Sequence, residues 1–172
     1  MGGSSPEIVD RMSIDAVLVR LLRPLLARAT RGVLREQIED RYLPDVFCSA
    51  TRLYRAASQD VPKEKTVGAR VMLRLAVFTI ALFRSLQAHG VPAGEARALT
   101  SEIAWRVYRM LAWAPWKLTR VISNDPLVRV KAAMDLFMRF PYSRPGYSMG
   151  YVGAGKRVVA FDHTRCVVGN RF

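Results

Sequence analysis

The pattern of the sequence changes at residue 146, and this change constrains the fold more than any other feature. Before it, long segments carry apolar residues at helical spacing and are interrupted by proline and glycine. After it, "GYSMGYV" and "RVVAFDHTRCVV" are rich in β-forming residues and are separated by "GAGK", a pattern typical of a hairpin. We therefore expect an α+β fold, with a mainly helical domain of about four to five helices followed by a C-terminal β-hairpin or partial sheet.

A length of 172 residues predicts one domain. We expect a flexible arm over residues 1–12 and a single helical domain over 13–172, whose terminal β segment spans 146–172. The expected helices cover residues 13–43, 45–57, 66–88, 93–113 and 126–140. Pro24 should kink the first helix or split it into two, and Pro115 should end the fourth, because proline lacks an N–H donor and its ring clashes with the preceding turn.

Local signals mark two of the helix boundaries clearly. Gly90 is suited to the position just after a helix end, and Pro92 prevents continuation of that helix. Asn124 or Asp125 can cap the last helix, which opens with Pro126 at its first position.

Composition favours a cytoplasmic protein with reduced thiols. The hydrophobic fraction of 51% is enough for a core, and Cys48 and Cys166 do not make a disulfide framework. The start, "MGGSSPEIVDRM", lacks the apolar stretch of a signal peptide. The apolar run at residues 75–83 is about half of the ~20 residues that span a bilayer, so we expect a buried helix there.

A net charge of +13 predicts an acidic or anionic partner. No nucleic-acid motif accompanies the charge, so nucleic acid is not the expected partner. Arg20, Arg28, Arg31 and Arg35 lie near one side of the first expected helix. This side is either a solvated face, the reading we favour, or a basic face for peripheral membrane contact.

No cofactor and no metal are expected. "GYVGAGKR" at 150–157 resembles a phosphate-binding loop, but Arg157 stands where that motif needs Ser or Thr, and a strand follows instead of a helix. A glycine-rich hairpin turn explains the same letters. Two histidines and two distant cysteines supply too few ligands for a metal site.

Aromatic residues cluster toward the end of the helix expected at 93–113. Trp105 and Tyr108 are neighbours at helical spacing, and Trp113 and Trp116 follow. These side chains either line a substrate pocket or pack in the core, and core packing is the commoner outcome.

The terminal strand carries the most reactive group of residues, Asp162, His163, Arg165 and Cys166. Side chains alternate across a strand, so Asp162, Thr164 and Cys166 should share one face and His163 and Arg165 the other. A regular strand therefore cannot make His163 the direct base for Cys166. A bulge, or a base from elsewhere in the fold, would be required.

The stretch "AFDHTRCVVGNRF" resembles the F-D-x-x-R-C-P-x-x-x-x-F segment of the L-2-amino-thiazoline-4-carboxylic acid hydrolase family. The matching positions are Phe161, Asp162, Arg165, Cys166 and Phe172. Val167 replaces the usual proline. The order of segments over residues 70–172, and more loosely 16–43, is also similar to the family, including "RFPYSRPGY" before the hairpin.

The resemblance implies hydrolytic opening of a cyclic amidine ring at its C–N bond. Cys166 would then act as the nucleophile or Asp162 as a general base. Arg165 would hold a substrate carboxylate, and His163 would join it in substrate binding. Trp105 and Tyr108 are the pocket candidates from the helices. The alternative is a non-catalytic subunit or binding protein that uses the same scaffold to contact an acidic partner, another chain or a membrane.

The family pattern continues beyond this strand with further strands that contain another cysteine and an acidic residue. An edge with apolar residues on both faces invites pairing. We therefore expect the terminal strand to be completed by a second copy in a homo-oligomer, by a partner subunit, or by residues beyond 172.

Overall fold

The structure of the chain is a computed structural model, which describes residues 24, 26–37, 42–60, 64–154 and 159–166. The labelled helices are α2 (Leu43–Gln59), α3 (Val67–Ala88), α4 (Ala93–Ile122) and α5 (Pro126–Arg139). A helical segment over 26–34 precedes them. Strands β1 (Tyr147–Ala154) and β2 (Val159–Cys166) form an antiparallel hairpin. This confirms the expected mainly helical α+β fold, while the expected arm at 1–12 lies outside the described residues.

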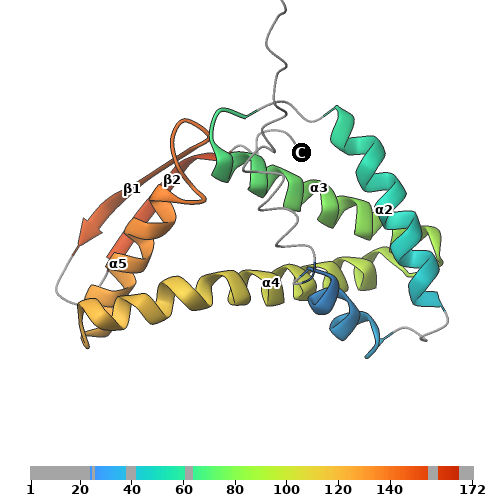
Figure 1. Cartoon of the computed structure of the whole chain (residues 1–172), viewed down its shortest axis with the longest axis horizontal. Coiled ribbons are helices and arrows are strands. Elements are labelled where there is room, and N and C mark those ends of the chain that lie inside the picture. Colours follow the sequence, from blue (N-terminus) through green and yellow to red (C-terminus); the bar gives the residue numbers. More distant parts are fainter. Residues whose placement is uncertain (1–23, 25, 38–41, 61–63, 155–158, 167–172) are drawn as a thin grey trace, which may run out of the picture.

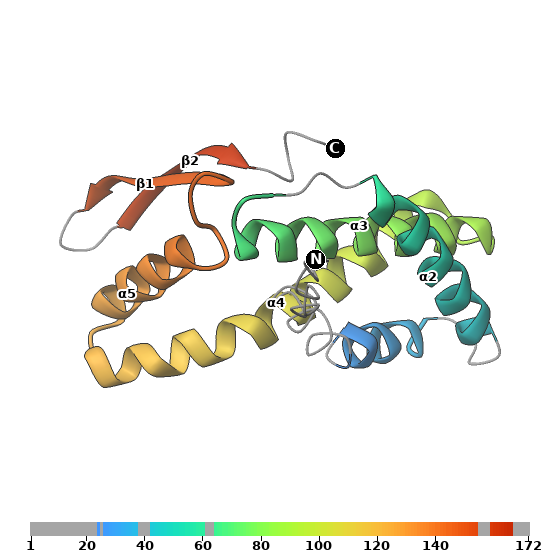
Figure 2. The ribbon, with the colours of Figure 1, turned by 45° about the horizontal axis from the view of Figure 1, so that its top comes forward.

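Helix α4 runs along the length of the molecule, with α3 packed beside it (Figure 1). Helix α2 covers one end of this pair, whereas α5 and the hairpin lie at the other end, as the second view also shows (Figure 2). The main core forms where α2, α3, α4 and the segment at 26–34 meet. Its buried members are Val33, Leu34, Leu43, Val46, Ala50, Leu82, Leu86, Ala96, Leu99 and Ile103.

The ends of α3 follow the local signals of the sequence. The Thr66 hydroxyl accepts a hydrogen bond from the Ala69 N–H at 3.2 Å and so caps the first turn. Gly90 takes a φ of 85° just after the helix, a conformation that favours glycine. Among the described residues, α3 is the one helix with the length and mean hydropathy to span a bilayer. Nine of its 22 residues are buried.

The expectation that Pro115 ends the fourth helix is wrong, because α4 continues through Pro115 to Ile122. Proline removes only one backbone hydrogen bond, and packing of α5 against the last turns of α4 offsets that loss. Arg129 of α5 stacks on the Trp116 ring, with the guanidinium carbon 4.4 Å from the ring centroid. Thr119 is buried, and its hydroxyl donates to the Trp116 carbonyl at 2.8 Å.

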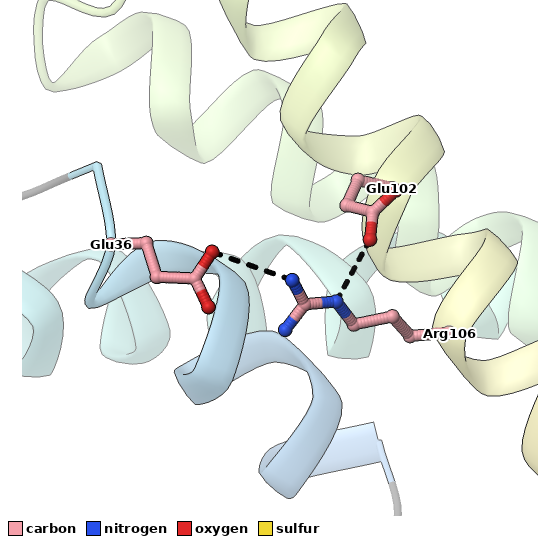
Figure 3. A network of polar contacts seen from close by, with 3 residues as sticks. All are labelled: Glu36, Glu102 and Arg106. Carbon is pink, nitrogen blue, oxygen red and sulfur yellow. Dashed lines mark hydrogen bonds and ion pairs between the residues drawn. The ribbon is translucent and has the colours of Figure 1, made fainter.

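The N-terminal helical segment is tied to α4 by one arginine. The Arg106 guanidinium donates to the Glu102 carboxylate at 2.8 Å and to the Glu36 carboxylate at 3.4 Å (Figure 3). The bond to Glu102, followed by that to Glu36, raises the pKa of Arg106. All three side chains are accessible to solvent, so this network orients the segment more than it stabilises the fold.

The last helix begins as predicted. Asp125 precedes Pro126, and its carboxylate accepts a hydrogen bond from the Leu127 N–H at 2.8 Å. The short connection turns the chain back, so that α5 reaches the hairpin and forms one wall of a cavity.

Candidate functional site

A cavity of about 810 Å³ lies between α3, α4, α5 and the hairpin. Its walls are aliphatic and aromatic side chains together with a few polar groups. The polar groups are those of Thr79, Thr100, Tyr108, Tyr142, Tyr147, His163 and Cys166. No Asp, Glu, Lys or Arg is among the lining residues in the described part of the chain. The volume is near the upper end of the range for small-molecule sites, about 300–1,000 Å³.

A bulge in β2 decides which residues of the hairpin face this cavity. Tyr147 pairs with Cys166 and Ser148 with Arg165, but the next residue of β1, Met149, pairs with His163. Thr164 is therefore the extra residue, and its hydroxyl donates to the Ser148 carbonyl at 3.3 Å.

The bulge brings His163 and Cys166 to the same face of the strand. Both line the cavity, as do their cross-strand partners Met149 and Tyr147. The expectation that Cys166 shares a face with Asp162 is wrong, because the extra residue reverses the alternation between them. Asp162 is exposed, lies outside the cavity lining, and accepts a hydrogen bond from the His163 backbone N–H at 2.8 Å.

A row of ring contacts crosses the site from α4 to β2. Trp105 and Tyr108 stack with centroids 5.8 Å apart, and the row continues through α5 and the loop before β1. The later pairs are Tyr108 with Phe137 at 6.1 Å, Phe137 with Tyr142 at 6.3 Å, Tyr142 with Tyr147 at 5.0 Å, and Tyr147 with His163 at 5.8 Å. Aromatic contacts of this kind fix ring orientations, so this row of contacts fixes the positions of the side chains that form one wall of the cavity.

Tyr147 is the most enclosed polar residue of the site, with only 1% of its surface exposed. Its hydroxyl is buried and has no hydrogen-bond partner within the described residues. Burial, followed by the nearby Cys166, raises the pKa of Tyr147, and burial likewise raises the pKa of Tyr142. Both phenols are therefore neutral at physiological pH, and each retains a proton to donate.

The structure brings three of the six predicted site residues to the cavity: Tyr108, His163 and Cys166. Trp105 lies one layer away, stacked on Tyr108. The side chain of Arg165 lies outside the described part of the structure.

The expected core packing of the tryptophans is wrong. Trp105 and Trp113 are more than half exposed, and Trp116 is also exposed. The cause is that α4 is covered mainly on one side: its buried residues form one stripe, and the three tryptophans lie off that stripe.

Sequence reasoning missed the residues that complete the walls, above all Tyr142, Tyr147 and Phe137. Tyr142 and Tyr147 belong to "RFPYSRPGY", which on sequence grounds was expected only to precede the hairpin, and Phe137 lies in α5 just before this segment. Two tyrosines beside prolines just before a strand were the available signal, since a proline-fixed turn holds such side chains against the preceding helices.

The fold and site define a mainly helical α+β protein with an apolar cavity that contains a thiol and an imidazole. Comparison of the chain with known family models, curated proteins and solved structures finds no match in any of the three.

Proposed function

We propose that this chain is a small-molecule hydrolase in which Cys166 is the nucleophile and His163 exchanges protons with it. The observation that carries the proposal is the bulge at Thr164, which turns both side chains toward one cavity. Covalent hydrolysis uses a thiol together with a base, and this cavity of ligand size is lined by both. His163 is exposed, so the pair lies where the cavity reaches solvent and water can enter.

The resemblance to thiazoline carboxylate hydrolases supports a cyclic amidine as the substrate class. His163 takes the thiol proton, and the Cys166 sulfur adds to the carbon of the protonated amidine, whose C=N double bond becomes single as its electron pair returns to nitrogen. The ring C–N bond then breaks, and the leaving nitrogen takes the proton from His163. Water adds to the same carbon and gives its proton to His163, and the Cys166 thiolate leaves, so that one water is consumed for each ring opened.

Neutral phenols can donate hydrogen bonds to the negative charge that develops during this reaction. The Tyr147 hydroxyl is buried near Cys166, and the raised pKa keeps it protonated. A donor that is already desolvated stabilises a developing anion without first losing water. We assign Tyr147 this role, with Tyr142 beside it.

The cavity also sets the substrate's shape. It is several times larger than a bare thiazoline ring, and its described lining is free of charged side chains. The substrate should therefore carry a large apolar substituent. A charged carboxylate would have to lie outside this lining, and Arg165 is the partner that the family resemblance implies for it.

The uncharged lining also favours a second candidate function, non-catalytic binding of an apolar small molecule. In that case Cys166 and His163 are contact residues and no bond is broken. The two functions share a ligand class and differ only in turnover.

The test measures ring opening of 2-amino-thiazolines by liquid chromatography, using alkyl substituents of increasing length. We expect turnover to rise with chain length and to fall at least about a hundredfold in Cys166→Ser and in His163→Gln. Cys48→Ser is the matched control, because Cys48 is exposed on α2 and is not among the residues that line the cavity. Unchanged turnover in Cys166→Ser would exclude the nucleophile. Saturable binding of the same compounds without turnover would support the second candidate.

A further inference from the structure

The last turns of α4 carry an apolar surface that no described residue covers. We call this surface the α4 end face; it consists of Trp113, Lys117, Leu118, Val121 and Ile122. The four apolar members are all more than 60% exposed, and Val121 reaches 88%. The face lies at the end of the molecule where α4 turns into α5 (Figure 1). Thr119, the one buried residue of 116–122, points to the opposite side of the helix.

The charges at this face are all positive. The Lys117 ammonium lies over the Trp113 ring, 5.8 Å from its centroid, and Arg120 is exposed one turn after Trp116. Residues 113–122 contain no Asp or Glu. The nearest acidic residue that follows, Asp125, is held in the cap of α5 by its bond to the Leu127 N–H. A ligand for this face must therefore be apolar and anionic at once.

We propose that the α4 end face binds the surface of an anionic lipid bilayer. The apolar side chains would enter the boundary between headgroups and acyl chains, where tryptophan is favoured, and Lys117 and Arg120 would contact lipid phosphates. The net charge of +13 draws the whole protein toward such a surface. The proposal uses different residues from the cavity and does not depend on the proposed hydrolase activity.

The charge pattern favours lipid over a second copy of the chain. In a two-fold dimer the same face meets itself, so Lys117 and Arg120 of one protomer would approach the same cations of the other. Like charges brought together across an interface oppose association. An anionic bilayer neutralises these cations while it covers the apolar residues.

The experiment uses the full chain with vesicles of phosphatidylcholine alone and vesicles that also contain phosphatidylglycerol. We expect sedimentation with the anionic vesicles and little with the neutral ones. Reversal of both cations, Lys117→Glu with Arg120→Glu, should weaken binding by about thirtyfold or more. The matched control, Arg84→Glu with Arg97→Glu, makes the same change in net charge at two exposed sites elsewhere and should stay within about threefold of the wild type.

The three tryptophans allow the contact to be located. A protein that keeps only Trp113 (Trp105→Phe, Trp116→Phe) should be quenched by lipids brominated on their acyl chains. A protein that keeps only Trp105 (Trp113→Phe, Trp116→Phe) should not be quenched. Quenching of Trp105 alone, or no sedimentation with anionic vesicles, would overturn the proposal. A lipid-free dimer that Val121→Asp dissociates would overturn it in favour of self-association.

Discussion

At the scale of single residues, Tyr147 shows most clearly how a group can lower stability and still be suited to function. Its ring packs on Ala69, Tyr142 and Cys166, and this contact fixes the hairpin on α3. Its hydroxyl, however, is buried without a described partner, and an unsatisfied buried polar group costs about 1–3 kcal/mol. A phenylalanine would fill the same space without that cost. The tyrosine is therefore best explained by a hydrogen bond from its hydroxyl to a bound ligand.

Tyr147→Phe should therefore stabilise the protein and damage the site. We expect the free energy of unfolding to rise by about 1 kcal/mol, measured by urea denaturation. Binding or turnover of alkyl thiazolines should fall in the same variant, since the proton donor is lost. A loss of stability would show that the hydroxyl already has a partner in the free protein.

Tyr151 gives a prediction for alkaline pH. Its hydroxyl donates to the Asp135 carboxylate at 2.8 Å, and burial, followed by this bond, raises its pKa from 10.0 to about 12. Above pH 10 the unfolded chain releases this proton while the folded chain keeps it, so the free energy of unfolding falls as pH rises toward 12.

The phenolate absorbance band and urea denaturation at several alkaline pH values check this prediction. Tyr151→Phe should make the alkaline loss of stability smaller. Asp135→Asn should lower the pKa of Tyr151, because the carboxylate that opposes phenolate formation is removed. The same titration in both variants as in the wild type would contradict the assignment.

At the scale of elements, a close approach of backbone to backbone holds the site together. A Cβ at Gly68, in the first turn of α3, would lie 2.8 Å from the carbonyl carbon and Cα of Pro141. A Cβ at Gly146 would lie 2.8 Å from the Ala69 Cβ. These two glycines let the segment before β1 cross α3 closely enough for Tyr147 to be buried.

Gly68→Ala should force that segment away from α3. Overpacking of this kind costs about 1–3 kcal/mol, and the effect should include lower protection of the hairpin amides in hydrogen exchange. Gly94→Ala is the matched control, since nothing lies within 4 Å of a Cβ there and α4 should become more stable by up to about 1 kcal/mol. Equal stability of the two variants would contradict the close approach.

The sequence predicted the elements better than the site, for a physical reason. Helical spacing, the Asp125 cap and Gly90 are local signals, so α3, α5 and the hairpin were predictable. The passage of α4 through Pro115 depends on packing against α5, which local signals do not contain. The bulge at Thr164 is a property of two paired strands. The sequence alone could therefore show only that a bulge would be required for His163 and Cys166 to share a face, and not that the bulge is present.

At the scale of the whole molecule, the hairpin is a two-stranded sheet within the described residues, and its outer edges have no strand partner there. Two strands alone are marginal in water, and exposed edges are templates for pairing. The prediction therefore stays that a second copy, a partner subunit or residues beyond 172 pair with one of these edges.

Light scattering and small-angle X-ray scattering across a dilution series test this expectation. Mass should rise with concentration, and the amides of β2 should become more protected as it does. Val121→Asp should not alter this association, because it changes the α4 end face and not the sheet. A monomer at high concentration, with both strand edges protected, would contradict the expectation.

The bulge also bears on how such a gene can vary in length. Loss of one codon within a strand normally exchanges the two faces of everything beyond it. Thr164 is an exception, because deletion of its codon would leave His163 two positions from Cys166, and that spacing again puts both on one face. Related genes can therefore differ by one codon here while the thiol and the imidazole keep a common orientation, whereas loss of a second codon would separate them.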